Sequence, residues 1–225
     1  MRIVSLVPSV TETLSIWGRA PVACTRFCER DDIETVGGTK NPDVERIVAL
    51  APDLVVVDAE ENRREDYDAL VERGLDVHVL HVRDLNDVDP MMAELAARVD
   101  ANWRPLEVGD ATTPWRSAFI PIWRRPWMAL GEPTYGSSLL AHLGVTNVFS
   151  GDGPYPEVNL DAARALQPDV VLAPSEPYPF SERQRDELES VAPMTLLDGK
   201  DLFWWGERTR AALRRVADVL RETPR

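Results

Sequence analysis

The chain has 225 residues, of which 44% are apolar and 28% charged, and its formal net charge is −13. This much apolar material supports a folded core and excludes an intrinsically disordered chain. The acidic balance argues against nucleic acid or an anionic membrane as partner, and fits a small-molecule ligand or a basic docking surface. No run of 18 apolar residues occurs, so the sequence predicts no membrane-spanning helix.

The first part of the chain alternates short apolar runs with helical patterns. Ser9 stands three residues before Glu12, which predicts a capping box for a helix that runs to Gly18. Further helices are predicted from Asn41-Pro42-Asp43 onward and near 64–73. The apolar runs predict buried parallel strands at Ile3–Val7, Val22–Thr25, Leu54–Val57 and Val77–Val82.

The middle of the chain is less regular. Asp89-Pro90 predicts the start of a helix that ends near Asp100. Residues 102–114 contain two prolines and a glycine and are expected to form a loop. We therefore divide the chain into an N-terminal lobe (1–83), a linker with a short helix (84–115) and a C-terminal lobe (116–225).

The last part repeats the alternation of strands and helices. Helices are predicted at 135–143 and at 206–221. A third helix is predicted between them, where Ser181 and Gln184 have the spacing of a capping box. Strands are predicted at Phe119–Trp123, Asn147–Phe149, Val170–Ala173 and Met194–Leu197. The chain is thus predicted to be an α/β protein with mainly parallel sheets.

An internal repeat explains this rhythm. The segment 41–57, NPDVERIVALAPDLVVV, matches 155–172, YPEVNLDAARALQPDVVL, at an offset of 116 residues. Glu45 then matches Asp161, and Pro52-Asp53 matches Pro168-Asp169. Agreement across a helix, a break and a strand indicates two Rossmann-like lobes built on one plan and joined by the linker helix.

Aromatic residues crowd the loops that follow predicted strands. Ligands of open α/β sheets gather beyond the carboxyl ends of the strands, and flat rings suit a large, partly apolar ligand. We therefore expect a cleft between the lobes whose ligand-binding residues are Phe27, Trp123, Trp127, Tyr155, Trp204 and Trp205. Ordinary core packing is the alternative for each of them, and it is preferred for Trp17.

Glu45 and Asp161 form a second candidate site. Both lie in the first turn of a predicted helix, after the possible caps Asp43 and Asn159. An acidic side chain there simply complements the helix dipole, which is the plainer interpretation. The functional hypothesis is that each lobe presents one carboxylate to a basic, two-fold symmetric partner.

The sequence offers little for catalysis or metal binding. It contains no GxSxG, P-loop or GxGxxG motif, and we assign no catalytic residue and no metal ligand. His78 and His81 are three apart in a predicted strand and would point to opposite faces. Cys24 and Cys28 are four apart, which fits neither a CxxC pair nor a zinc site, so we expect small buried thiols.

The segments RIVSLVPSVTETL at 2–14 and NPDVERIVALAPDLVVV at 41–57 resemble the helical-backbone class of binding proteins of ABC importers. WRRPWMALGEPTYGSSLLAHLGVTNVF and YPEVNLDAARALQPDVVLAPSEPYPF continue the resemblance, which is greatest for the vitamin B12-binding branch. It implies that Glu45 and Asp161 dock on arginines of a membrane permease. It also places corrinoid-binding aromatics on or near Phe27, Trp127 and 203–205.

The resemblance implies a monomer that binds a metal chelate without altering it. The ligand would be cobalamin or another corrinoid, otherwise an iron–siderophore or haem, and no intrinsic cofactor is expected. Met1-Arg2 runs directly into the first predicted strand without an export signal, which predicts a cytoplasmic protein, whereas the family implies a periplasmic one. A cytoplasmic accessory protein or enzyme of corrinoid metabolism, and an interaction module with a decayed ligand site, therefore remain alternatives.

Overall fold

The computed structural model describes residues 1–223, which form two compact units. The first unit contains residues 1–82, 86–106 and 205–208. The second contains residues 83–85 and 107–204, and resumes at Thr209. The predicted linker is thus divided: its helix belongs to the first unit, and its loop from Glu107 onward belongs to the second.

The first unit is built on a five-stranded sheet in the order β3-β2-β1-β6-β7. Every neighbouring pair in it is parallel. Its strands are β1 (Ile3–Ser5), β2 (Ala23–Cys24), β3 (Glu34–Thr35), β6 (Leu54–Asp58) and β7 (Val77–Leu80). A small antiparallel pair, β4 (Gly37–Gly38) and β5 (Asn41–Pro42), precedes α2.

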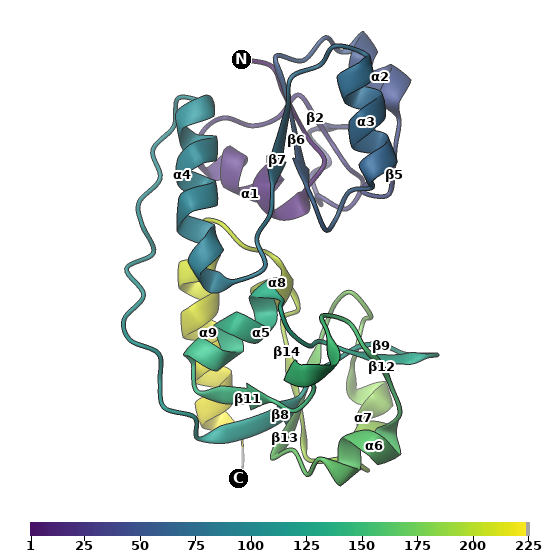
Figure 1. Cartoon of the computed structure of the whole chain (residues 1–225), viewed down its shortest axis with the longest axis vertical. Helices are drawn as coiled ribbons and strands as arrows, with labels where there is room; N and C mark the ends of the chain where they lie inside the picture. The colour runs from purple at the N-terminus through teal and green to yellow at the C-terminus, as the bar shows by residue number, and fades with distance from the viewer. Residues whose placement is uncertain (224–225) are drawn as a thin grey trace. The chain divides into compact units, whose positions relative to one another are not determined.

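Helices cover both faces of this sheet, as parallel sheets require (Figure 1). Figure 1 shows α2 (Val44–Ala49) and α3 (Arg64–Glu72) on one side. On the other side lie α1 (Pro8–Ile16) and α4 (Val88–Arg98), the latter preceded by the short 3-10 helix η1 (Leu85–Asp87). Fully buried side chains of β1 and β6 pack with Ile47 of α2 and Leu70 of α3.

The second unit holds a four-stranded parallel sheet in the order β11-β8-β13-β14. Its strands are β8 (Arg116–Phe119), β11 (Val145–Asn147), β13 (Val170–Pro174) and β14 (Met194–Leu197). A separate antiparallel sheet, in the order β12-β10-β9, contains β9 (Pro121–Trp123), β10 (Trp127–Ala129) and β12 (Glu157–Val158).

Helices also frame the second unit. They are α5 (Tyr135–His142), α6 (Leu160–Ala165), α7 (Arg185–Leu188), α8 (Lys200–Phe203) and α9 (Thr209–Glu222), with the 3-10 helices η2 (Ser150–Asp152) and η3 (Glu182–Gln184). Phe119, Val171, Ala173 and Leu188 are fully buried in its core. The Ser181–Gln184 capping box is confirmed at the start of η3.

The internal repeat is confirmed at the level of backbone structure. Helix α2 and strand β6 become α6 and β13 when 116 is added to each residue number, and β5 becomes β12 in the same way. Both predicted caps are present: the Asp43 side chain accepts the Arg46 N–H, and the Asn159 side chain accepts the Ala162 N–H. The sheet orders β2-β1-β6-β7 and β11-β8-β13-β14 also correspond.

Four local predictions were wrong. Helix α1 begins at Pro8 after an uncapped Val7, and the buried Ser9 hydroxyl caps nothing. The predicted strand 119–123 is two strands in different sheets, β8 and β9. The strand predicted at 147–149 lies two residues earlier, as β11. The last helix begins at Thr209 and not at Gly206, whose backbone is left-handed with φ 104° and therefore not helical.

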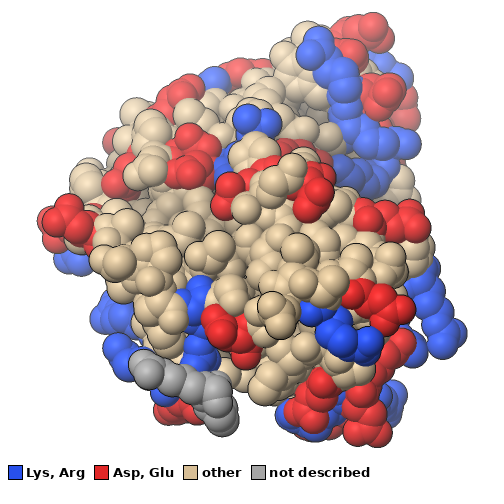
Figure 2. All heavy atoms as spheres, turned by 60° about the horizontal axis from the view of Figure 1, so that its bottom comes forward, with Lys and Arg blue, Asp and Glu red and all other residues tan. Residues whose placement is uncertain are grey.

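Within residues 1–223, no helix is long and apolar enough to cross a bilayer. Figure 2 shows one face of the molecule, on which acidic and basic side chains alternate around a largely uncharged centre. On this face neither sign forms a single continuous patch.

Candidate functional site

In the first unit, the loop at the carboxyl end of β2 carries one candidate ligand contact, Phe27. Phe27 follows β2 in a tight turn, in which the Cys28 N–H donates to the Thr25 carbonyl over 3.0 Å. Phe27 is 50% exposed, and the Arg26 guanidinium lies 4.9 Å from the centroid of its ring. This exposed ring is available for stacking, as predicted for a ligand contact.

A cavity of about 320 Å³ lies at the carboxyl end of β6. Val57, Tyr67 and Val79 supply apolar surface, and Arg63 and Arg64 line it at the start of α3. Both arginines are already paired, Arg63 with Asp66 and Arg64 with Asp68. The cavity therefore combines apolar walls with guanidinium groups whose charge is balanced by neighbouring carboxylates.

Asp58 ends β6 beside this cavity and is 3% exposed. One carboxylate oxygen accepts the N–H groups of Glu60 and Glu61, over 2.9 and 3.1 Å, which bends the chain toward α3. The other oxygen is buried and has no hydrogen-bond partner. Burial raises the pKa of Asp58 above its ordinary value, although the two N–H bonds oppose the shift.

In the second unit, four aromatic rings form a continuous row. Trp123 meets Tyr178 edge to face at 5.8 Å, and Tyr178 lies 4.7 Å from Phe180. Phe180 in turn stacks on Trp127 at 6.0 Å, with the ring planes 5° apart. The structure thus brings together Trp123 and Trp127, two of the predicted ligand contacts, through two rings of the loop that follows β13.

Arg124 lies beside this row of rings. Its guanidinium is 6.0 Å from the centroid of Trp127, and its Nε donates to Glu187 over 3.0 Å. The Tyr178 hydroxyl and the Glu187 carboxylate both raise the pKa of Arg124, which stays charged. The sequence analysis did not name Arg124, because no local pattern marks a cation that contacts a ring of one segment and a carboxylate of another.

The other predicted aromatic contacts, Tyr155, Trp204 and Trp205, differ from one another in exposure. Tyr155 lies just before β12 and is 42% exposed. Trp204 and Trp205 are only 9% and 4% exposed, so in this conformation they offer little ring surface to a ligand. Lys200 lies over the Trp204 ring, 4.7 Å from its centroid. A role of these residues in ligand binding stays a prediction.

Glu45 and Asp161 occupy equivalent places in the first turns of α2 and α6. Their side chains are 72% and 90% exposed. Glu45 forms a bidentate ion pair with Arg73, which lowers the pKa of Glu45. Asp161 accepts from Arg164, one turn further along α6, over 2.9 Å. Both carboxylates are accessible, and each is paired with an arginine of its own unit.

Side chains that could hold a metal do not gather. Among residues 1–223, no group of three or more histidine, cysteine or acidic side chains has a metal-binding arrangement. His78 is buried in β7, whereas His81 is exposed beyond the end of that strand. Cys24 and Cys28 are buried free thiols, as predicted.

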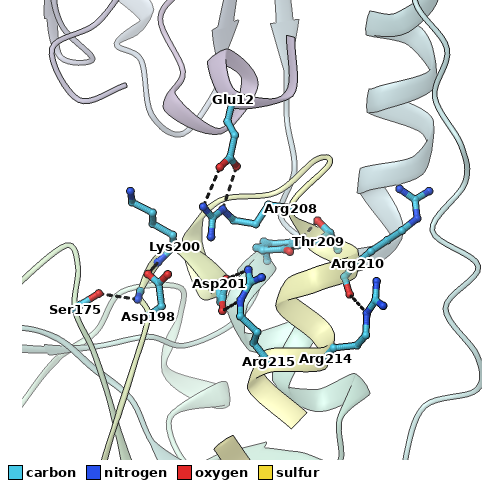
Figure 3. Close-up of polar contacts among 12 residues, drawn as sticks. Glu12, Ser175, Asp198, Lys200, Asp201, Arg208, Thr209, Arg210, Arg214 and Arg215 are labelled. Carbon is cyan, nitrogen blue, oxygen red and sulfur yellow. Dashed lines mark hydrogen bonds and ion pairs between the residues drawn. The ribbon is translucent and has the colours of Figure 1, made fainter. Parts of the chain in front are cut away.

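Two ion pairs flank the segment where the chain passes between the units near residue 205 (Figure 3). In the first unit, Arg208 binds Glu12 of α1 through two nitrogens, over 2.8 and 3.0 Å. In the second, Arg215 of α9 binds the buried Asp201 of α8 over 2.5 and 2.8 Å. The first pair lies wholly within the first unit and the second wholly within the second.

Residues 3–113 match the model of the periplasmic binding protein family. The predicted family resemblance is confirmed. The vitamin B12-binding protein of Vibrio campbellii is 25% identical over 192 residues, which cover 76% of this chain and 70% of that protein. The vitamin B12-binding protein of Pectobacterium carotovorum is 22% identical over 233 residues, with 90% and 81% coverage.

Solved structures of periplasmic binding proteins share the fold of this chain. The periplasmic vitamin B12-binding protein BtuF of Vibrio cholerae superposes with a TM-score of 0.80 at 19% identity, covering 98% of this chain and 96% of its own. The periplasmic haem-binding protein BhuT has a TM-score of 0.78 at 19% identity, with 97% and 98% coverage. The predicted two-lobed α/β fold with mainly parallel sheets is therefore confirmed.

Proposed function

We propose that this protein binds a bulky metal chelate without transforming it and acts as the substrate-binding component of an ABC importer. The observation that carries the proposal is the row of rings Trp123–Tyr178–Phe180–Trp127. Trp123 ends β9 and Trp127 begins β10, both beyond the carboxyl end of β8, and the other two rings lie in the loop beyond β13. The exposed Phe27 lies beyond β2, the strand of the first unit that corresponds to β11. Ligands of α/β sheets bind beyond such strand ends.

A corrinoid is the ligand that we favour. Its large conjugated ring offers apolar area to exposed aromatic side chains such as Trp123 and Tyr155 of the second unit, which bury much area at low rotamer cost. The relatives named vitamin B12-binding proteins support this choice. Haem is the second candidate, because haem-binding proteins share the fold, and an iron–siderophore is the third. In each case the metal belongs to the ligand.

Delivery to a permease would use Glu45 and Asp161. Each carboxylate stands in the first turn of a repeated helix, and each already binds an arginine of its own unit. Arginine side chains of a partner would replace Arg73 and Arg164 with bonds of the same kind, so the exchange costs few hydrogen bonds. The structural relatives include an ABC transporter substrate-binding protein of Listeria monocytogenes, with a TM-score of 0.71 at 16% identity. This likeness supports transport over a cytoplasmic accessory role.

Tryptophan fluorescence tests the proposed ligand class directly. The full chain is titrated with cyanocobalamin, cobinamide, haemin and a ferric siderophore, each corrected for inner-filter absorption. We expect saturable quenching at one equivalent by cyanocobalamin and cobinamide, with weaker effects of haemin and the siderophore. Tighter binding of haemin would assign the site to haem, and failure of all four to saturate would contradict the proposal.

A further inference from the structure

Cys24 and Cys28 form a buried pair next to the Phe27 turn. Cys24 ends β2 and is 1% exposed, and Cys28 closes the turn and is 5% exposed. The two side chains belong to one small apolar cluster with Ile33. Neither thiol is in a disulfide. The pair is thus separated from solvent by a single turn, whose residues Arg26, Phe27 and Glu29 are exposed.

The surroundings of Cys28 are polar for a buried thiol. The Thr11 hydroxyl of α1 lies 3.2 Å from its sulfur, and the Thr25 hydroxyl lies 3.3 Å from it. Both threonines are themselves buried. The Thr25 hydroxyl can donate to a Cys28 thiolate at this distance and stabilise its charge, and the Thr11 hydroxyl, which donates to the Val7 carbonyl over 3.1 Å, can do so by exchanging that bond. An inert structural cysteine, by contrast, lies among apolar groups.

The two thiols also differ in acidity. The neighbouring Cys24 thiol and the two threonine hydroxyls lower the pKa of Cys28 to about 6, and the Cys28 sulfur in turn raises the pKa of Cys24. Cys28 is therefore the nucleophile of the pair, and Cys24 keeps its proton until Cys28 has reacted. This division of roles is the one found in dithiols that undergo exchange.

We propose that Cys24 and Cys28 form a reactive dithiol that is oxidised to an intramolecular disulfide by low-molecular-weight disulfides. The Cys28 thiolate attacks one sulfur of the small disulfide, and a small thiolate leaves. Cys24 then loses its proton to that thiolate and attacks Cys28 Sγ, which releases the second small thiolate. Two protein S–H bonds and one S–S bond of the reagent become one protein S–S bond and two small thiols.

The reaction would change the segment that carries Phe27. A bond between residues 24 and 28 closes the turn covalently at its base and ties it to the end of β2. The turn must open for the first attack, because Cys28 is 5% exposed. The inference concerns the thiols alone and does not depend on which ligand the protein binds.

Mass spectrometry of the full chain tests the proposal. The protein is incubated with oxidised glutathione at pH 7.5, quenched with acid, denatured and alkylated. We expect loss of both alkylation sites and a mass decrease of about 2 Da, since one disulfide replaces two thiols. The Cys24→Ser variant should stop at a mixed disulfide between glutathione and Cys28, and the Cys28→Ser variant should form no adduct at Cys24.

Thr11→Val provides a graded test. This change removes one hydroxyl from Cys28 Sγ, and we expect the rate of oxidation at pH 6.5 to fall several-fold. Thr146→Val, at an exposed site in β11, is the matched control and should leave the rate unchanged. The proposal is overturned if the folded wild-type protein retains two alkylatable thiols after treatment while the unfolded protein oxidises. It is equally overturned if glutathione appears on Cys24 rather than Cys28.

Discussion

Ala51 and Gln167, which lie 116 residues apart, both have a left-handed backbone, with φ of 44° and 49°. Each follows the end of a repeated helix and precedes a proline that leads into a buried strand. A side chain in this conformation brings Cβ close to the backbone oxygen and costs free energy. The same strained connection has been kept in both halves of the molecule.

This conformation predicts that glycine is tolerated at both sites. Ala51→Gly and Gln167→Gly remove a cost of about 1–2 kcal/mol in the folded state and add about 0.4–1 kcal/mol of unfolded-state entropy. We expect each change to raise the free energy of unfolding by about 0.5–1 kcal/mol, measured by urea denaturation. Ala217→Gly, inside α9, is the control and should lower it by about 1 kcal/mol. Destabilisation at both turn sites would show that the left-handed backbone is not strained.

The carboxylates Glu45 and Asp161 are expected to act in docking alone. Changing both to lysine should abolish binding to the cognate permease in a pull-down, because two acceptors of arginine become cations. Ligand affinity should not change, since both side chains are exposed and paired within their own units. The control reverses Glu72 and Glu157, which are also exposed, and makes the same change in net charge. If ligand affinity falls in the first variant, the docking assignment is wrong.

Alanine substitutions at Trp123 and Trp127 should both affect ligand affinity, whereas only the second should lower the free energy of unfolding substantially. Trp123 is 43% exposed, whereas Trp127 stacks on Phe180 and packs against the buried core of its unit. Both alanine variants should weaken ligand binding by about 1–3 kcal/mol in calorimetric titration. Trp127→Ala should also lower the free energy of unfolding, by about 2–4 kcal/mol, and Trp123→Ala should change it far less. Unchanged ligand affinity in either variant would remove that ring from the site.

His78 predicts a loss of stability in mild acid. Burial lowers its pKa below the ordinary value of 6.5, against the opposing attraction of Glu94 and Asp76 and in concert with Arg98. Because the unfolded chain binds this proton more readily, the free energy of unfolding should fall as the pH drops from 6.5 through the folded-state pKa. Urea denaturation of wild type and His78→Gln between pH 5 and 7.5 measures this slope. We expect His78→Gln to show a smaller dependence of the free energy of unfolding on pH than the wild type. The control His142→Gln should show the same dependence as the wild type.

Asp58 should contribute the opposite dependence of the free energy of unfolding on pH. Its raised pKa means that the folded chain holds the proton more tightly than the unfolded chain, whose pKa is near 3.8. This contribution to stability is complete below pH 3.8 and disappears as the pH rises through the folded-state pKa. Asp58→Asn keeps an acceptor for the Glu60 and Glu61 N–H groups but carries no charge. The Asp58→Asn variant should therefore have a higher free energy of unfolding than the wild type at pH 7.5 and a similar one near pH 4. Equal free energies of unfolding at both pH values would contradict the raised pKa of Asp58.

The repeat is the part of the fold that the sequence predicted best. Asp43 and Asn159 cap helices that begin one residue later, and β6 and β13 are continuous apolar runs after proline. These signals lie within short stretches of sequence, so they can be recognised without knowledge of tertiary contacts. The unpredicted elements β10 and β12 are two or three residues long and exist through pairing with distant residues.

The candidate site could be predicted only as a set of residue types. Loops rich in aromatics marked Phe27 and Trp123, which are exposed, and equally Trp204 and Trp205, which are buried. Exposure of a ring is decided by what packs on it, and no local pattern reports that. The row from Trp123 to Trp127 likewise depends on Tyr178 and Phe180, more than fifty residues further along the chain.

Equilibrium dialysis of the full chain against cyanocobalamin is the most direct test of the central claim, that this doubled α/β protein holds a metal chelate and leaves it intact. We expect retention of one cobalamin per chain that saturates, and release of the unchanged compound on denaturation, as judged by its absorption spectrum and mass. Retention of none of cobalamin, cobinamide, haem or a ferric siderophore would contradict the claim. So would recovery of the bound compound in a chemically altered form.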